Sequence, residues 1–367
     1  MENWFNILDV DLLDTPALVV YPDRVKHNIA LLKSKVDNID RLRPHVKTHK
    51  CKEAVFLCME AGISKFKCAT IAEAEMLGLC AVKDVLLAYQ PIGPKINRFI
   101  ALIKQYPHTQ FSCLVDNLDA AKQINKLARE NDLMVNIYID LNVGMNRSGI
   151  APVAAFELYK QCAGLLNINI IGLHVYDGHL RDEDLTIRTQ RCNEAFEPVE
   201  KLAEQLKNIG FDPIIVAGGT PTFPIHALRK NIECSPGTFI YWDNGYGRTL
   251  KEQVFLSAAL VVTRVVSLPD ETKICVDLGH KSIASENVLD KRVVFLNAQQ
   301  LKFISQSEEH LVLDAGLNHN YKVGDLLYGV SHHICPTVAL YERAIVIEDK
   351  HTAGEWKNIA RDRKINI

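Results

Sequence analysis

The chain has 367 residues, of which 48% are hydrophobic and 23% are charged, so it can bury a large core and is too apolar to be disordered. Its 42 basic and 44 acidic residues leave a formal net charge of -2, and no dense basic tract occurs. This balance argues against binding to nucleic acid or to a membrane surface, and we expect a small-molecule ligand.

The first residues, Met1 to Phe5, lack the charged-then-apolar layout of a signal peptide, and the sequence contains no apolar run of about 18 residues. These features predict a cytoplasmic protein. The ten cysteines are scattered among apolar neighbours, for example Cys68 and Cys162. Such placement is typical of buried, reduced thiols rather than of a disulfide framework.

From residue 42 to about residue 240, apolar β-branched runs alternate with helix-like stretches such as 117–130 and 183–207, which predicts repeated βα units. The eight candidate strands end at Val46-Lys47, Cys68-Ala69-Thr70, Leu87-Ala88-Tyr89, Leu114-Val115-Asp116, Ile139-Asp140, Leu173-His174, Val216-Ala217-Gly218 and Glu233-Cys234-Ser235. Polar and glycine-rich residues follow these ends, where barrel active sites are built. We therefore predict an α/β fold with a (β/α)8 TIM-type barrel over residues 21–246, and a doubly wound sheet as the alternative.

After Tyr246-Gly247-Arg248 the pattern changes to short β-rich runs without spacers long enough for helices. This predicts a second, mainly antiparallel β domain over residues 247–367. The early apolar run Ala17-Leu18-Val19-Val20 precedes the eight barrel strands, so we expect residues 1–20 to join the β domain.

The segment Arg43-Pro44-His45-Val46-Lys47-Thr48-His49-Lys50 places a lysine where an apolar strand opens into a polar loop. Aromatic and basic neighbours can lower the pKa of such an amine, which then forms a Schiff base with a carbonyl cofactor. The alternative is a solvated lysine at a strand end.

Three further strand ends carry candidate binding groups. The loop Ala217-Gly218-Gly219-Thr220-Pro221-Thr222 offers backbone N–H groups and hydroxyls that suit a phosphate, although glycine pairs also occur in plain turns. Arg147, between two glycines, can donate to a phenolate or a carboxylate, or remain solvated. His174-Val175-Tyr176-Asp177-Gly178-His179 supplies imidazoles and a phenol that can orient an aromatic ring or move protons.

Near the C-terminus, His333-Ile334-Cys335 follows an apolar run. In extended chain, residues two apart point the same way, so His333 and Cys335 can bind one metal ion while His332 faces elsewhere. A thiolate with an imidazole favours zinc over magnesium or manganese, and two protein ligands leave positions open for a substrate. The alternative is a buried cysteine beside a surface histidine.

Together these motifs resemble the fold-type III pyridoxal-phosphate enzymes, in the branch of D-serine dehydratase and metal-activated D-threonine aldolase. The resemblance covers nearly the whole chain and rests on Asp14-Thr15-Pro16-Ala17, residues 43–50, Ala69-Thr70-Ile71-Ala72-Glu73-Ala74-Glu75, residues 144–149, 172–179 and 218–222, Pro236-Gly237-Thr238 and His333-Ile334-Cys335. It implies an alanine racemase-like barrel followed by a β domain, and a homodimer.

The resemblance also implies roles for individual residues. Lys47, rather than Lys50, would bind pyridoxal 5'-phosphate (PLP), Arg147 would meet its phenolic oxygen and Tyr176 would border it. The residues assigned to the cofactor are Lys47, His45, Arg147, His174, Tyr176, Gly218, Gly219 and Thr220, the last three at its phosphate. Ala217 departs from the family, which often has serine there. Zn²⁺ would bind His333 and Cys335.

Within this branch, His-x-Cys with zinc is associated with dehydratases and His-x-Asp with aldolases, so the sequence favours a lyase that converts D-serine to pyruvate and ammonia. Lys47 would take the Cα proton, and zinc would stabilise the leaving hydroxyl. The alternatives are cleavage of D-threonine to glycine and acetaldehyde, racemisation with a second base such as Tyr321 or Tyr328, and a PLP-binding protein without turnover. The residues that read the substrate's side chain are not identified.

Overall fold

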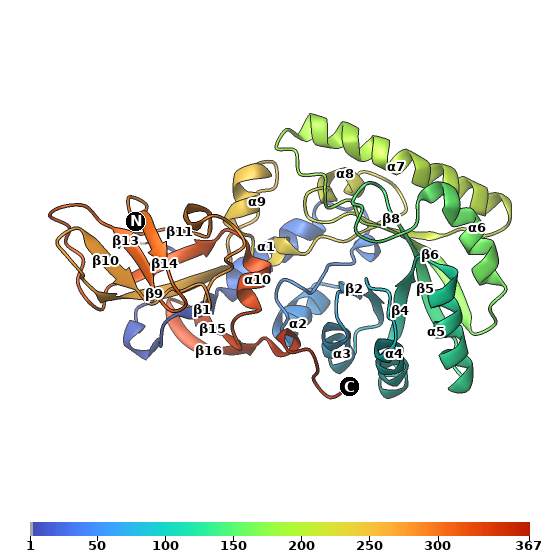
Figure 1. The fold of residues 1–367 in the computed structure, drawn as a ribbon, viewed down its shortest axis with the longest axis horizontal. Helices are drawn as coiled ribbons and strands as arrows, with labels where there is room; N and C mark the ends of the chain where they lie inside the picture. Colours follow the sequence, from blue (N-terminus) through green and yellow to red (C-terminus); the bar gives the residue numbers. More distant parts are fainter. Residues whose placement is uncertain (1–2) are drawn as a thin grey trace. The chain divides into compact units, whose positions relative to one another are not determined.

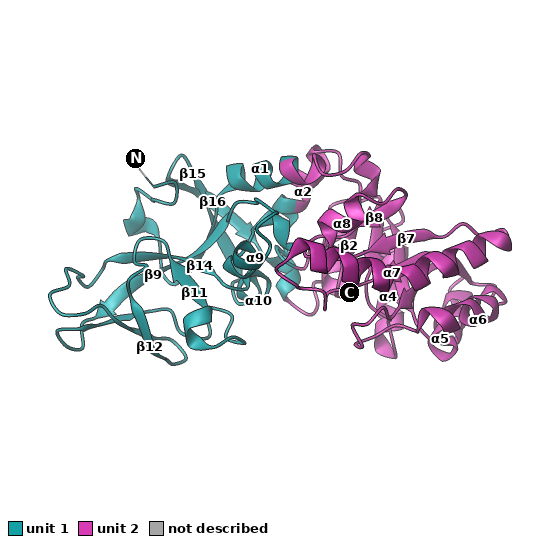
Figure 2. Cartoon of the chain, turned by 90° about the horizontal axis from the view of Figure 1, so that it is seen from above, with its two compact units in different colours: residues 1–30, 48–54, 238–361 teal, residues 31–47, 55–237, 362–367 magenta. Residues whose placement is uncertain are grey.

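The computed structural model describes residues 3–367, which divide into two units (Figures 1 and 2). Unit 1 comprises Met1–Ala30, Thr48–Ala54 and Thr238–Arg361, and unit 2 comprises Leu31–Lys47, Val55–Gly237 and Asp362–Ile367. Met1 and Glu2, where the expected β-domain segment 1–20 begins, lie outside the described residues. Helices α1 (Pro22–Lys33) and α2 (Lys52–Glu60) each begin in unit 1 and end in unit 2.

Unit 2 contains a curled parallel sheet whose strands follow one another in chain order. Its strands are β2 (Lys65–Cys68), β3 (Asp84–Leu87), β4 (Gln110–Val115), β5 (Val135–Leu141), β6 (Ile168–Val175), β7 (Ile214–Ala217) and β8 (Ile232–Cys234). The connecting helices are α3 (Ile71–Leu79), α4 (Pro94–Gln105), α5 (Leu118–Glu130), α6 (Pro152–Ala163), α7 (Leu185–Asn208) and α8 (Phe223–Ala227) (Figure 1). This is the predicted class of fold, a barrel built from repeated βα units.

One predicted strand, the one that ends at Val46-Lys47, is not a regular strand. The segment instead makes isolated bridges on both sides, from Leu42 to Cys234 and from His45 to Lys67. Backbone N–H groups of Arg43 and Val46 still donate across these edges, at 2.9 Å each. Pro44 explains the irregularity, because it lacks the N–H that a ladder needs. The sheet therefore has seven regular strands within residues 3–367, and an irregular segment takes the place of the first.

Local signals in the sequence start the helices of unit 2. Thr70 caps α3 by accepting a hydrogen bond from the Glu73 backbone N–H at 3.1 Å, while the Glu73 carboxylate accepts from the Ala69 N–H at 2.6 Å. This reciprocal arrangement is close to a capping box. Asn117 caps α5 in the same way, by accepting from the Ala120 N–H at 2.9 Å.

The residues inside the parallel sheet change from charged to apolar along the strands. Arg43, which has no exposed surface, donates to both oxygens of Asp84 at 2.6 and 2.8 Å and to Glu233 at 2.6 Å. Leu86, two residues after Asp84 on β3, belongs to an apolar cluster with Leu114, Tyr138 and Val216. Side chains two residues apart share a face of a strand, so the same face passes from an ion network to an apolar layer.

Unit 1 contains a nine-stranded, mainly antiparallel sheet. Its strands are β1 (Ala17–Val20), β9 (Ala259–Ser267), β10 (Lys273–Val276), β11 (Val293–Phe295), β12 (Lys302–Gln306), β13 (Leu311–Asp314), β14 (Leu326–Ser331), β15 (Arg343–Glu348) and β16 (His351–Lys357). Strand β1 pairs antiparallel with β9 and parallel with β15. Helices α9 (Asn244–Thr249) and α10 (Ile334–Val338) and the 3-10 turns Val10–Leu12, Thr238–Ile240, Leu289–Lys291 and Ile359–Arg361 complete the unit; Ile39–Arg41 is the corresponding turn of unit 2.

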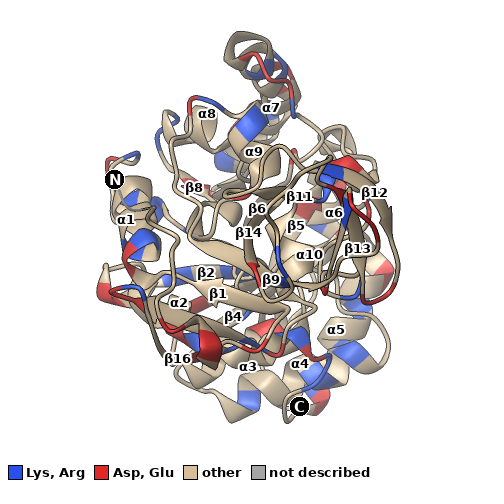
Figure 3. Ribbon diagram, turned by 90° about the vertical axis from the view of Figure 1, so that its left-hand side faces the viewer, with Lys and Arg blue, Asp and Glu red and all other residues tan. Residues whose placement is uncertain are grey.

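Charged residues of both signs are mixed along the chain, and most cysteines are buried. Acidic and basic residues are interspersed along the helices and loops (Figure 3). Within residues 3–367, no helix has the length and apolar character needed to cross a bilayer. None of the ten cysteines forms a disulfide, and all except Cys335 are buried.

Replacing Arg43 with methionine should lower the free energy of unfolding by about 3–5 kcal/mol, because it leaves two carboxylates without their buried partner. The measurement is chemical denaturation of both proteins. Lys201→Ala is the control in the same unit, since its ion pair with Glu197 is exposed and should contribute little. Equal midpoints for Arg43→Met and the native protein would contradict a stabilising role for this network.

Candidate active site

Strand-end side chains of unit 2 line a cavity of about 590 Å³. The alternation of side chains on β3 and β4 continues into it, because Ala88 and Asp116 follow Leu86 and Leu114 by two residues. The lining residues are His45, Lys47, Lys67, Ala69, Ala88, Tyr89, Gln90, Ile92, Leu114, Asp116, Asp140, Arg147, Ser148, His174 and Tyr176. The structure thus gathers five of the residues assigned from the sequence: His45, Lys47, Arg147, His174 and Tyr176.

Three cations surround the ring of Tyr176 in this cavity. The amines of Lys47 and Lys67 lie 5.9 and 5.7 Å from the ring centroid, and the Arg147 guanidinium carbon lies 4.8 Å from it. The His45 Nδ1 accepts a hydrogen bond from the Lys47 backbone N–H at 3.1 Å, so its proton is on Nε2. A cavity with this charge suits an anionic, aromatic ligand.

His174 is held by a neighbouring strand. The parallel register places Asp140 of β5 directly opposite His174 of β6, and the His174 Nδ1 lies 2.7 Å from the Asp140 carboxylate, which also accepts from Ser148 at 3.0 Å. Burial lowers the pKa of His174 despite this carboxylate. Its Nε2 is buried and has no hydrogen-bond partner within residues 3–367. An imidazole fixed on one side and unpaired on the other is suited to contact a ligand.

The glycine-rich loop after β7 differs from the simple cradle of N–H groups that the sequence predicts. The Gly218 N–H donates to the Val175 carbonyl at 2.8 Å, and the Gly219 N–H donates to the Thr222 hydroxyl at 3.3 Å. The glycines instead permit close approach, because a Cβ on Gly218 would lie 2.7 Å from the His226 ring and one on Gly219 would lie 3.0 Å from the Tyr176 ring. Helix α8, which follows, has only five residues.

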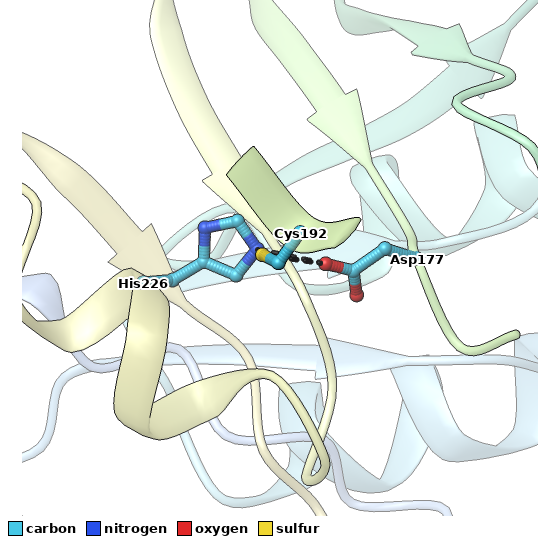
Figure 4. Close-up of side chains that lie close together, drawn as sticks. All are labelled: Asp177, Cys192 and His226. Atoms are coloured by element: carbon cyan, nitrogen blue, oxygen red, sulfur yellow. Dashed lines mark hydrogen bonds and ion pairs between the residues drawn. The ribbon is translucent and has the colours of Figure 1, made fainter. Parts of the chain in front are cut away.

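A buried cluster of side chains supports this loop (Figure 4). Asp177 accepts from the Thr222 hydroxyl at 2.7 Å and lies 2.8 Å from the His226 Nε2, and the Cys192 sulfur lies 3.5 Å from the same nitrogen. Burial raises the pKa of Asp177, but the hydrogen bonds from His226 and Thr222 hold this pKa below its ordinary value. Sequence reasoning named Asp177 only within a motif and missed the cluster, whose members come from three separate segments.

Asp177, Cys192 and His226 have the ligand types of a metal site and lie within 4.8 Å of one another. The geometry favours a hydrogen-bonded support instead. Asp177 and His226 already satisfy each other directly, and burial together with Asp177 raises the pKa of the Cys192 thiol to about 12, which opposes formation of the thiolate that binds metal.

His333 and Cys335 lie in unit 1, at the start of α10. The segment is extended only at His333, and Cys335 lies in the first turn of the helix, so the extended spacing assumed from the sequence is wrong. The two side chains nevertheless interact: burial lowers the pKa of His333, but the hydrogen bond and charge of Cys335, with Glu286, raise it to about 9. His332 instead lies 3.4 Å from the Asn244 side chain.

The surroundings of this pair resemble those of a metal site. The His333 Nδ1 lies 2.5 Å from the Glu286 carboxylate, an arrangement that orients metal-binding histidines. The Cys335 sulfur lies 3.1 Å from the hydroxyl of Thr48, the residue that follows Lys47 in the chain. Glu286 is 47 residues from His333 in the sequence, and no local pattern indicated it.

The fold is a barrel of βα units whose cavity is lined by two lysines and an arginine. Residues 20–245 match the family described as "Alanine racemase, N-terminal domain", and residues 258–347 match the "Putative serine dehydratase domain". The chain therefore belongs to the alanine racemase N-terminal domain family, within the fold-type III PLP enzymes.

Relatives match along most of the chain. A D-threonine aldolase from Arthrobacter sp. is 25% identical over 95% of this chain and 93% of its own, and a D-threo-3-hydroxyaspartate dehydratase from Delftia sp. (strain HT23) is 26% identical over 68% of each. The crystal structure of D-threonine aldolase from Filomicrobium marinum superposes with a TM-score of 0.87, at 25% identity over 98% of both chains. The named aldolase and dehydratase relatives are lyases that act on D-amino acids.

Replacing Asp177 with alanine should destabilise the protein by about 2–3 kcal/mol, because Thr222 and His226 lose a buried partner, and should also weaken PLP binding by loosening the loop. Denaturation and cofactor titration measure the two effects. The control is Asp182→Ala, which removes a carboxylate paired with the half-exposed Arg191. Unchanged stability and unchanged PLP affinity in Asp177→Ala would contradict the supporting role.

Proposed function

We propose that this protein is a PLP- and zinc-dependent lyase for 3-hydroxy D-amino acids, and that its reaction is the conversion of D-serine to pyruvate and ammonia. The observation that carries the choice of reaction is the His333–Cys335 pair with its carboxylate partner Glu286. Imidazole and thiolate together suit zinc, and zinc can withdraw electrons from a substrate hydroxyl.

The cavity of unit 2 fits the cofactor. Lys47 would bind its aldehyde carbon, Arg147 its phenolic oxygen, and the ring of Tyr176 would border the pyridine. The His174 Nδ1–H donates to Asp140, so the Nε2, which has no partner within residues 3–367, would accept a hydrogen bond from the ligand. Gly218, Gly219 and Thr220 would hold the phosphate, in the loop where the glycines let the His226 and Tyr176 rings approach the backbone closely. PLP supplies the electron sink for a carbanion at Cα.

The steps of the reaction would depend on different residues of the chain. With PLP bound, the amine Nζ of Lys47 would take the proton from the substrate's Cα. Asp140 keeps His174 oriented in the cavity. Loss of hydroxide from Cβ would be assisted at His333 and Cys335, and Glu286 would hold the His333 ring by its Nδ1.

The crystallised dehydratase from Delftia sp. HT23 supports the metal assignment. One variant with a cysteine replaced by alanine is described as being in the metal-free form, and another has an alanine in place of a histidine two positions earlier. His333 and Cys335 have the same spacing. At 22% identity these structures show the fold alone, so the metal of this chain stays a proposal.

D-threonine aldolase is the second candidate. The aldolase from Arthrobacter sp. matches 95% of this chain, a longer alignment than that of the hydroxyaspartate dehydratase. The same lysine and metal would serve a retro-aldol cleavage, which needs a base for the hydroxyl proton. Racemisation has less support, because Tyr328 is buried in the core of unit 1 and Tyr321 accepts a hydrogen bond from Gln300. The expected homodimer also stays a prediction.

Purified protein with PLP and zinc should release pyruvate from D-serine, and Lys47→Ala should reduce turnover by about 10²- to 10⁴-fold. Lys50→Ala is the matched control, three residues further along the chain, and should retain activity. The measurement is product analysis with D-serine and, separately, D-threonine. Glycine and acetaldehyde from D-threonine, without pyruvate from D-serine, would move the assignment to aldolase.

Zinc binding can be tested without turnover. Cys335→Ala should lose bound zinc, and Glu286→Gln should lower zinc affinity by about 10- to 100-fold, because His333 loses its orienting carboxylate. Cys192→Ala, in the buried cluster of unit 2, should retain the native zinc content. Elemental analysis and chelator competition measure these values. Loss of zinc in Cys192→Ala, with retention in Cys335→Ala, would place the metal at Asp177, Cys192 and His226 instead.

A further inference from the structure

Lys67 is a second lysine in the cavity, and the function proposed above gives it no role. It lies on β2, only 2% of its surface is exposed, and it lines the same cavity as Lys47. A buried lysine is costly unless its charge is compensated or its proton is lost.

The strand explains how this lysine enters the interior. Lys65, Lys67 and Ala69 alternate with Phe66 and Cys68, and the bridge from Lys67 to His45 places both on the side that faces the cavity. Lys65 lies on the same face two residues earlier, and its amine forms an ion pair with Glu233 at 2.5 Å. Lys67 comes two residues later, and its amine forms no ion pair with a carboxylate within residues 3–367.

The environment of Lys67 combines apolar groups with charged groups of both signs. Its strand neighbour Leu86 belongs to the apolar cluster, while its amine lies 5.7 Å from the Tyr176 ring centroid. The charged groups that act on it are Lys47, Asp177, Asp140 and Arg43; His45, Asp116, Arg147 and His174 line the same cavity. Burial, and then the charge of Lys47, lower the pKa of Lys67 to about 7.

The acidic groups nearby are already engaged. Asp140 binds His174 and Ser148, Asp177 binds Thr222 and His226, and Asp116 accepts from the Gly149 N–H at 3.1 Å. Lys47 lines the same cavity, and the amines of both lysines lie within 6 Å of the Tyr176 ring centroid, at 5.9 and 5.7 Å. Like charges in one cavity oppose each other.

We infer that Lys67 is a positioning residue of the cofactor site, and that its charge sets the pH at which the imine formed by Lys47 and PLP loses its proton. This inference rests on the proposed function, because it requires PLP at Lys47. It adds a residue that governs how readily the cofactor site accepts and releases protons.

The physical argument is electrostatic. A protonated imine nitrogen is a cation, and an ammonium in the same low-dielectric cavity opposes it, so a charged residue 67 lowers the imine pKa and a neutral one raises it. The effect is reciprocal, because protonation of either group lowers the proton affinity of the other. A shift of about one pH unit is expected for like charges that share one cavity.

The experiment is a pH titration of the visible absorption band of the PLP-loaded protein, without substrate. Lys67→Met, which is neutral, should raise the midpoint by about one pH unit, and Lys67→Arg, which is permanently charged, should lower it. The native curve should be broader than a one-proton curve. Lys65→Met, on the same face of the same strand, is the control and should titrate like the native protein.

Methionine fills a similar volume and removes a buried charge, so Lys67→Met should fold; Lys67→Gln is a second neutral variant if it does not. Identical midpoints in the native, methionine or glutamine, and arginine proteins would overturn the inference while leaving the proposed function intact. If no band forms, or if the band persists in Lys47→Ala, the proposed function fails and the inference fails with it.

Discussion

The register of the parallel sheet in unit 2 is the constraint on which the candidate site depends. Because side chains two residues apart share a face, β3 passes from Asp84 in the ion network of Arg43, through Leu86 in the apolar cluster, to Ala88 in the cavity. The same register places Asp140 opposite His174. A shift of one residue in a strand would turn its cavity residues towards the helices.

The balance of charge in the cavity follows from this arrangement. Lys47, Lys67 and Arg147 surround Tyr176, whereas Asp140 hydrogen bonds to His174 and Ser148. An anionic ring with a phosphate and a phenolic oxygen complements such a site. The family relationship and the cavity therefore give consistent and independent support for PLP, while the reaction depends on the chemistry proposed for His333 and Cys335.

Motifs at strand ends made much of this architecture readable from the sequence, because parallel strands bring their carboxyl ends together. Other features could not be read. Pro44 interrupts a run that otherwise looks like a strand. The pattern of Lys65-Phe66-Lys67-Cys68 is typical of a strand with its lysines in solvent, but in the structure Lys67 is buried. Glu286 meets His333 across 47 residues, and Asp177, Cys192 and His226 meet only through the fold.

The most direct test of the account is to load the protein with PLP, reduce it with borohydride and locate the modified lysine by peptide mass spectrometry. Reduction converts the imine to a stable secondary amine, so the cofactor remains on the residue that held it. The account predicts the modification on Lys47, and none in Lys47→Ala. Modification mainly on Lys67 or Lys50, or a protein that takes up no PLP, would contradict the assignment on which the proposed function rests.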